Sequence, residues 1–206
     1  MLKLPQITLC TFGAEKYKES QQNMLKHCHQ GILFGDIKNI IVPTNTIDEW
    51  NRAVVFDLGD HIDTEFALLV HPDGGVANPD AWDDKWLEYD FIGAPWPIPE
   101  DDFSYVDIGG VRQRVGNSVA LRSKKLMQLP KKENFEWKAF HGFFNEDGYI
   151  AVNMRHKFEE HGCKFAPFEE AVKFGMEHPL PEHEGVRSFT YHKNYGTNAE
   201  YPNFEI

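Results

Sequence analysis

An apolar run, Glu-Phe-Ala-Leu-Leu-Val over residues 65–70, is followed directly by His-Pro-Asp-Gly-Gly. Because the run does not alternate with polar residues, it predicts a strand buried on both faces, as in a sheet covered by helices. Proline cannot continue a central ladder, and paired glycines allow a sharp turn and close backbone approach by a ligand. The sequence therefore predicts His71 and Asp73 at the carboxyl end of a central strand, where open α/β sheets bind ligands. A strand that simply ends in a polar turn is the alternative.

Strand-like and helix-like segments alternate ahead of this strand. They are a strand over residues 6–12 that ends at Gly13, a helix over 14–30, a strand over 39–42 and a helix that begins at Thr46 and ends at Gly59. Apolar side chains recur at helical spacing in both helices, namely Tyr17, Met24, Leu25 and Cys28 in the first and Ile47, Trp50, Val54 and Leu58 in the second. Thr46 and Glu49 form a possible capping box. This order implies right-handed crossovers, a largely parallel sheet and the α/β fold class.

The second half of the chain is less regular. We expect a short helix over residues 82–90, strands over 91–93 and 115–123, a helix over 124–129, a helix that opens at 145 with Ile150, Met154, Phe158 and His161 on one face, and short strands over 164–167 and 188–192. The segment 94–110 is rich in proline and acidic residues, and loops of this length often act as lids. The Glu- and His-rich stretch over 177–184 is expected to be a solvated loop without a site.

Composition excludes several classes of protein. A formal net charge of −11 opposes binding to a nucleic acid backbone, so we expect no nucleic acid partner. No apolar run approaches ~18 residues and no signal pattern is present, so we expect no membrane span. The cysteines are few, odd in number and without metal spacing, which favours reduced thiols in the cytoplasm. An anionic small ligand would need a cation or a local basic cluster.

Four groups of residues are candidates for chemistry. Asp73 with His71 suits Mn²⁺ or Mg²⁺, although one acid makes a thin site that a phosphate-bearing ligand would have to complete. Asp147, beside Glu146, is a candidate general base, with helix capping as the alternative. Small residues over 116–118 permit close approach of a sugar ring, or a tight packing crossing. The fourth group is His192, a possible metal ligand or a structural histidine, with Lys193 placed to meet a phosphate.

Six blocks of sequence together resemble a glycosyltransferase-like domain family that occurs in bacteria, eukaryotes and large DNA viruses of algae. The blocks are Leu-Leu-Val-His-Pro-Asp-Gly, Trp-Leu-Glu-Tyr-Asp-Phe-Ile-Gly-Ala-Pro-Trp, Val-Gly-Asn-Ser-Val-Ala-Leu-Arg-Ser, Asn-Glu-Asp, Phe-Ala-Pro-Phe-Glu-Glu-Ala and Phe-Thr-Tyr-His. The resemblance covers about residues 5–193 and is strongest to N-terminal domains of chlorella virus proteins. It implies a GT-A fold in a single domain over 1–193, with a nucleotide-binding half over 1–75 and a donor-sugar and acceptor half over 76–193. It also implies a longer polypeptide, in which 194–206 is a tail or linker.

The resemblance assigns roles to some of the candidate residues. Asp73 falls at the last acid of the Asp-x-Asp metal motif, and His71 replaces its first acid. His192 falls at a late histidine that returns to the metal or diphosphate, and Asp147 at the acid that inverting relatives use as base. The donor-binding positions are Thr11, Phe12 and Gly13 for the base and ribose, and Gly116, Asn117 and Ser118 near the sugar, with Ser118 in place of a glycine.

The activity implied is transfer of a hexose or deoxyhexose from a nucleotide-sugar to a hydroxyl of a glycan or glycoprotein acceptor. UDP-sugars are favoured as donors, Mn²⁺ or Mg²⁺ is the expected cofactor, inversion is the expected outcome, and the host cytoplasm is the expected location for a virus-encoded member. A nucleotide-sugar or glycan-binding module that has lost turnover is the alternative. A metal-dependent hydrolase or nuclease is disfavoured, because a cluster of carboxylates is missing.

Overall fold

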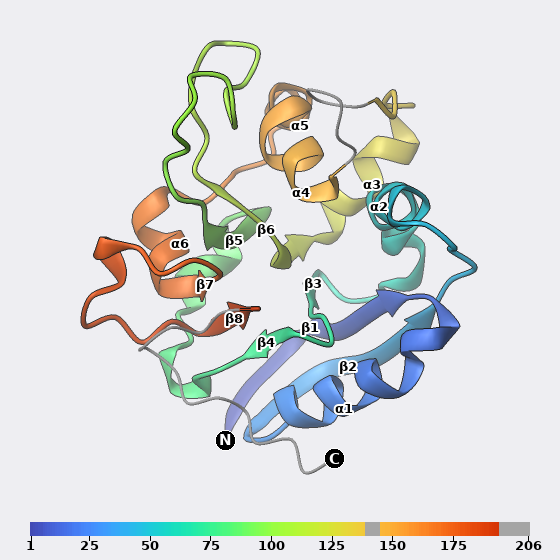
Figure 1. Cartoon of the computed structure of the whole chain (residues 1–206). Coiled ribbons are helices and arrows are strands. Elements are labelled where there is room, and N and C mark those ends of the chain that lie inside the picture. The colour runs from blue at the N-terminus through green and yellow to red at the C-terminus, as the bar shows by residue number, and fades with distance from the viewer. Residues whose placement is uncertain (139–144, 194–206) are drawn as a thin grey trace.

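A five-stranded mixed sheet forms the centre of the computed structural model, which describes residues 1–138 and 145–193 (Figure 1). Its strands are β1 (Leu2–Gly13), β2 (Ile32–Ile41), β3 (Phe66–Leu69), β5 (Phe91–Pro95) and β6 (Val115–Ser123), in the order β2-β1-β3-β6-β5. β1 pairs in parallel with β2 and β3, whereas β6 runs antiparallel to β3 and β5. The α/β class is thus confirmed, and the sheet is mixed because β6 enters it reversed. The expected tail or linker over 194–206 lies outside the described residues.

Strand β3 is buried on both faces, as its apolar run predicts. Phe66 and Leu68 lie in the core that contains Met24 and Leu25 of α1 (Lys18–Cys28). The intervening residues, Ala67 and Leu69, lie in the core on the other face. That face is covered by α2 (Ile47–Phe56) and α3 (Lys124–Lys132). A strand whose two faces both meet helices has no position left for an exposed polar residue.

The two predicted N-terminal helices form, but each begins with an apolar residue that is not buried. Residues Glu15–Tyr17 form a 3-10 turn (η1) before α1, and Tyr17 is 48% exposed. At the start of α2, Ile47 is 68% exposed. The Thr46 hydroxyl accepts a hydrogen bond from the Glu49 N–H, as the capping box predicts, but the Glu49 carboxylate accepts from the Asn45 N–H. The spacing predicted the buried faces correctly beyond the first turn and failed where each helix starts at the edge of the sheet.

A second, three-stranded sheet has the order β4-β8-β7. Its strands are β4 (Gly74–Val76), β8 (Thr190–His192) and β7 (Gly175–Met176). The strand expected over 188–192 is therefore present, whereas the one expected over 164–167 is only a single bridge between Phe165 and Phe91. The helix expected over 82–90 is a 3-10 turn, η4 (Asp84–Glu88), and a second such turn, η3 (Pro79–Ala81), precedes it.

A third core lies beside β5 and β6, where the chain after residue 145 packs. Its segments are α4 (Glu146–Gly148), a wide π turn (η5, Tyr149–Asn153) and α5 (Arg155–Glu160). Ile150, Met154 and Phe158 are buried as the spacing predicts, whereas His161 is exposed. The remaining elements are η2 (Leu58–His61), α6 (Phe168–Phe174) and η6 (Pro181–His183).

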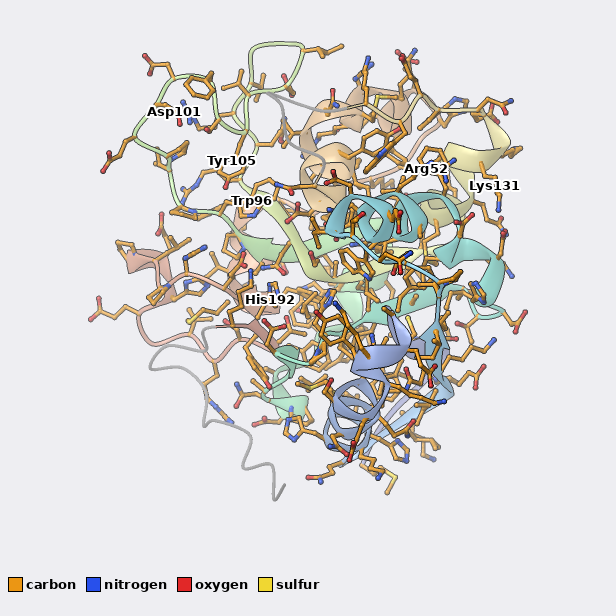
Figure 2. All side chains as sticks on the ribbon, turned by 45° about the vertical axis from the view of Figure 1, so that its right-hand side comes forward. Arg52, Trp96, Asp101, Tyr105, Lys131 and His192 are labelled. Atoms are coloured by element: carbon orange, nitrogen blue, oxygen red, sulfur yellow. The ribbon has the colours of Figure 1, made fainter. Side chains whose placement is uncertain are left out.

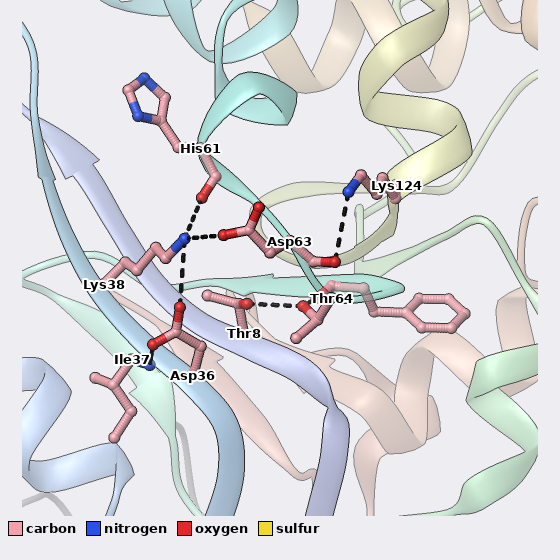
Figure 3. A network of polar contacts seen from close by, with 9 residues as sticks. Thr8, Asp36, Ile37, Lys38, His61, Asp63, Thr64 and Lys124 are labelled. Atoms are coloured by element: carbon pink, nitrogen blue, oxygen red, sulfur yellow. Dashed lines mark hydrogen bonds and ion pairs between the residues drawn. The ribbon is translucent and has the colours of Figure 1, made fainter.

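A polar network holds the amino end of β3 (Figure 3). The Lys38 ammonium lies 2.8 Å from a carboxylate oxygen of Asp63 and 3.3 Å from one of Asp36. Thr8 and Thr64 share a hydrogen bond of 2.7 Å between their hydroxyls. These contacts tie the segment before β3 to β1 and β2, and so fix the strand whose other end carries His71 and Asp73.

Among the described residues, no helix is long and apolar enough to cross a lipid bilayer.

Candidate functional site

The turn that ends β3 is closed by the backbone and lies against β8. The His71 N–H donates to the Gly74 carbonyl, and the Gly74 N–H donates back to the His71 carbonyl. Gly74 then pairs with His192, and a Cβ on Gly74 would lie 2.8 Å from the His192 ring. Asp73 points back to the same histidine, with its Oδ1 3.6 Å from Nε2 of His192. Residues 119 positions apart in the sequence therefore meet at the carboxyl end of the central strand.

Glu177 joins this pair, although the sequence placed it in a solvated loop. It follows β7 directly, and because β7 pairs with β8, its side chain, only 12% exposed, reaches His192. The Glu177 Oε1 lies 3.1 Å from Nδ1 of His192 and 3.7 Å from the Lys193 ammonium. Two prolines made the segment read as a surface loop, and only the pairing of β7 with β8 brings Glu177 inward.

The charges of this cluster are strongly coupled. The charged His192 ring beside it lowers the pKa of Asp73 to about 2. Burial alone would lower the pKa of His192, but Asp73 and Glu177 outweigh it and raise that pKa to about 9. His71 is different, because burial and the neighbouring charge of His192 lower its pKa to about 3. At neutral pH the site thus holds two carboxylates, one imidazolium and one neutral imidazole.

Asn117 connects the cluster to β6. It has a φ of 87° although it is not glycine, and it is fully buried. Its Oδ1 accepts from the Val119 N–H, and its Nδ2 donates to Oε2 of Glu177 at 2.9 Å. A left-handed conformation at such a residue costs about 1–3 kcal/mol and persists where the surroundings enforce it, most often at functional sites. Ser118 follows on the same strand, and its carbonyl accepts a 3.5 Å hydrogen bond from Arg122.

The start of α4 presents Asp147 from the side of the third core. Glu146 is paired with Arg122 at 2.8 Å, and both side chains are at most 2% exposed. Glu146 Oε2 also accepts from the Asp147 N–H, and the Glu146 N–H donates to Oδ1 of Asn51. Poor hydration, then the charge of Glu146, raises the pKa of Asp147 to about 7. The charge of Glu177 also raises the pKa of Asp147, so the two carboxylates interact electrostatically.

Trp96 and Tyr105 form an aromatic stack next to the third core, on the side from which Asp147 is presented (Figure 2). Their ring centroids lie 4.3 Å apart at an interplanar angle of 12°. A Cβ on Gly116 would lie 1.9 Å from the Trp96 ring, so the indole occupies the space that a side chain at this position would need. Tyr105 has a φ of 58°, and burial followed by the charges of Asp147 and Glu177 raises the pKa of its hydroxyl. Sequence reasoning missed Tyr105, whose only signal was its place in the long loop.

A cavity of about 220 Å³ opens at the carboxyl ends of β1 and β2. It is lined by Phe12, Gly13, Ala14, Lys16, Tyr17, Gln21, Thr44, Asn45, Thr46, Ile47 and Trp50. Phe12 and Gly13 are thus in a position to contact a ligand, whereas Thr11 is buried and donates its hydroxyl to Oδ1 of Asn39. The Trp50 ring lies 5.4 Å from that of His71, which lies 5.4 Å from that of His192. A row of three rings therefore connects the cavity to the charged cluster.

A divalent ion can be tested against these residues. Within residues 1–138 and 145–193, no three side chains of His, Cys, Asp or Glu are arranged as a complete metal site. The donors present still fit a hard divalent ion, because Asp73 supplies a carboxylate and the buried Nε2 of the neutral His71 has no hydrogen-bond partner. Asp73 and His71 would hold such an ion with ligand phosphate oxygens as further donors, as Mg²⁺ commonly does, and His192 would join them once its imidazolium has lost a proton.

Comparisons with known proteins agree with this architecture. A family model described as "Protein of unknown function (DUF5672)" matches residues 58–192. A search of curated proteins found no significant match.

Solved structures give the fold. The chain is similar to a glycosyltransferase involved in the glycosylation of the major capsid of the chlorella virus PBCV-1, with a TM-score of 0.57 and 12% identity over 93% of this chain and 94% of that one. It is also similar to the galactosyltransferase LgtC in complex with donor and acceptor sugar analogues, with a TM-score of 0.52 and 13% identity over 90% of this chain and 86% of that one. An active-site mutant of LgtC matches with a TM-score of 0.51 and 14% identity, over the same shares. The fold is thus that of the GT-A glycosyltransferases, as the sequence resemblance implied.

Proposed function

The chain belongs to the DUF5672 family, and we propose that it is a metal-dependent glycosyltransferase. It would move a hexose or deoxyhexose from a nucleotide-sugar, with UDP-sugars favoured, to a hydroxyl of a glycan or glycoprotein acceptor. The observation that carries the proposal is that Asp73, Glu177 and His192 meet at the end of β3, next to a cavity of the size of a small ligand and within electrostatic range of Asp147. On a fold shared with glycosyltransferases, a charged cluster, a neighbouring cavity and a carboxyl with a raised pKa support the proposal.

The donor would span the row of rings from the cavity to the charged cluster. Its nucleoside would occupy the cavity beside Phe12 and Gly13, and its diphosphate would lie near Asp73 and His192. The imidazolium of His192 and the exposed ammonium of Lys193 offer positive charge there, in a chain whose formal net charge is −11. Mn²⁺ or Mg²⁺ held by Asp73 and His71, and by His192 once metal binding has displaced its extra proton, would supply the charge that a departing diphosphate needs.

Asp147 would remove the proton from the attacking acceptor hydroxyl. A carboxyl with a pKa of about 7 is ionised in part at neutral pH and is still basic enough to accept a proton, which is the balance that a general base requires. Asn117 and Glu177 offer an amide and a carboxylate for sugar hydroxyls, and the Trp96–Tyr105 stack presents ring surface beside them. A single base facing the acceptor favours inversion of the anomeric centre.

The test is release of nucleoside diphosphate from a panel of UDP- and GDP-sugars with Mn²⁺ and mixed glycan acceptors. Wild-type protein should release it from one donor class. Asp147→Asn should bind the same donor with little change in affinity while turnover falls by about 10²- to 10⁴-fold, the usual contribution of a general base. Full turnover by Asp147→Asn would exclude Asp147 as the base, and absence of both binding and release in the wild type would exclude the function.

A binding module without turnover is the second candidate. It is favoured by the incomplete set of metal ligands, in which His71 stands where an acid would give tighter binding. The same panel separates the two functions, because a binding module would bind a nucleotide-sugar or glycan in calorimetry without release of nucleoside diphosphate from any donor.

A further inference from the structure

We propose that Gln21 reads the nucleobase of the donor and that the cavity selects an imide base, uracil or thymine. The inference rests on the proposed function, since it takes a nucleotide to be the ligand of this cavity. It adds a base-reading residue, which no motif in the sequence predicts, and a reason why one class of base is accepted.

Gln21 is a polar side chain that is buried without its full set of partners. It lies on α1, is 3% exposed and lines the cavity beside Gly13. Its Oε1 has no hydrogen-bond partner in the structure. Its Nε2 lies against Gly13, 2.2 Å from the point where a Cβ would be. The amide nitrogen thus packs against the backbone of β1 at Gly13. A buried acceptor without a donor costs free energy of folding unless a ligand supplies the donor.

Three backbone acceptors on the same part of the cavity wall already have donors. The Phe12 carbonyl accepts from the Trp50 indole N–H, and the Gly13 carbonyl accepts from the Val42 N–H. The Ala14 carbonyl accepts from the Tyr17 N–H. Gln21 Oε1 is therefore the unsatisfied acceptor beside these carbonyls, and because the side chain is 3% exposed, its amide would turn toward the cavity to accept from a ligand N–H.

A single acceptor distinguishes between bases. Uracil and thymine carry one N–H on the pairing edge, at N3, between two carbonyls. Guanine presents N–H groups at N1 and N2, and cytosine and adenine each present an amino group with two N–H bonds. One acceptor satisfies the only N–H on this edge of the imide and leaves a donor of the other bases without a partner in a buried site, which is the kind of mismatch that gives strong discrimination.

Tyr17 supplies the face against which such a base would stack. The sequence pattern predicted it on the buried face of the helix, yet it is half-exposed, lines the same cavity and has the Lys16 ammonium 4.9 Å from its ring centroid. Stacking on an aromatic ring is available to every base. Tyr17 would thus add affinity, and Gln21 would add the choice of base.

The experiment is calorimetric titration of the whole chain, with Mn²⁺ present, by UDP, dTDP, GDP, CDP and N3-methyl-UDP. The last ligand lacks only the N–H that Gln21 would bind. UDP or dTDP should bind about 10-fold or more tightly than GDP and CDP, and N3-methylation should weaken UDP binding by about 10-fold or more. In Gln21→Met this penalty should fall below about threefold, because the acceptor is gone. UDP and dTDP differ in the 2′-hydroxyl and the 5-methyl group, so their ratio identifies which imide nucleotide fits.

Gln22→Met is the matched control, since Gln22 is the next residue on α1, is exposed and does not line the cavity. It should keep the full penalty. If Gln21→Met does not fold, Gly13→Ala gives the same comparison, because its Cβ would displace the Gln21 amide. Equal binding of UDP and N3-methyl-UDP by the wild type, or the same penalty in Gln21→Met, would overturn the role of Gln21. Absence of binding by every nucleoside diphosphate would overturn the proposed function as well.

Discussion

Asn117 holds the most unusual backbone conformation of the site, a φ of 87° inside a buried strand. The side chain compensates by bonding to Val119 on its own strand and to Glu177 across the cluster. The sequence singled out Asn117 because small residues flank it. It could not predict the contact with Glu177, which depends on the pairing of β7 with β8 far along the chain.

The pair Glu146 and Asp147 gives a pH prediction at the same scale. The Glu146 carboxylate accepts a hydrogen bond from the Asp147 N–H. Burial is the largest cause of the raised pKa of Asp147, and the negative charge of Glu146 is the second. A base with a raised pKa is protonated below about pH 7, so kcat/KM should rise with pH through that region. Glu146→Gln keeps an acceptor but removes the charge, so this limb should move down by about one pH unit.

The measurement is the pH profile of nucleoside diphosphate release by variants shown to be folded by circular dichroism. Glu160→Gln, an exposed acid on α5, should leave the limb in place. A profile that does not move in Glu146→Gln would mean that Glu146 acts only through its pair with Arg122. The titratable and charged groups that interact with Asp147 are Glu146, Glu177, Arg122 and Tyr105, and Arg122 opposes the upward shift of the Asp147 pKa.

At the scale of elements, strand β6 contributes residues to both sides of the candidate site. It enters the sheet reversed, so its residues 116–118 lie beside the turn after β3, and its Arg122 meets Glu146. The long loop between β5 and β6 is braced by its own hydrogen bonds, with Asp101 accepting from Ser104 and Asp107 from Gln113. These bonds give the loop a defined conformation, and the stacking of Trp96 on Tyr105 holds it next to the candidate site.

Gly116→Ala tests this anchor. Its Cβ would lie 1.9 Å from the Trp96 ring, so the indole must move and carry Tyr105 with it. We expect a loss of about 1–3 kcal/mol in the free energy of unfolding, as for an overpacked core, measured by urea denaturation. Gly148→Ala is the control, because its Cβ would meet its nearest neighbour at an ordinary 3.9 Å. Equal stability of the two variants would show that the stack does not depend on Gly116.

The elements also show how far sequence reasoning reaches. Strands β3 and β6 were predicted because apolar runs and small residues depend on local chemistry. The reversed direction of β6 and the inward course of the segment after β7 were not, since both are set by contacts between distant strands. The exposed Tyr17 and Ile47 were misassigned for a related reason, because helical spacing records which residues share a face but not where the sheet ends.

The whole molecule combines a strongly negative charge with a proposed site for a negatively charged donor. Its formal net charge is −11, and the charged cluster holds Asp73 and Glu177 around one imidazolium. A diphosphate can approach such a cluster only if cations offset these carboxylates. Donor binding should therefore depend on a divalent ion and on Asp73, the carboxylate proposed to hold that ion.

The most direct measurement is the thermal unfolding midpoint with a nucleotide-sugar, with Mn²⁺, and with both. A ligand at about 100 times its Kd adds about 2.7 kcal/mol, which raises the midpoint of a domain of this size by about 5–10 °C. We predict this rise for the wild-type protein only when a UDP- or dTDP-sugar and Mn²⁺ are present together, and its loss in Asp73→Ala. An equal rise without the metal, or an unchanged rise in Asp73→Ala, would contradict the account.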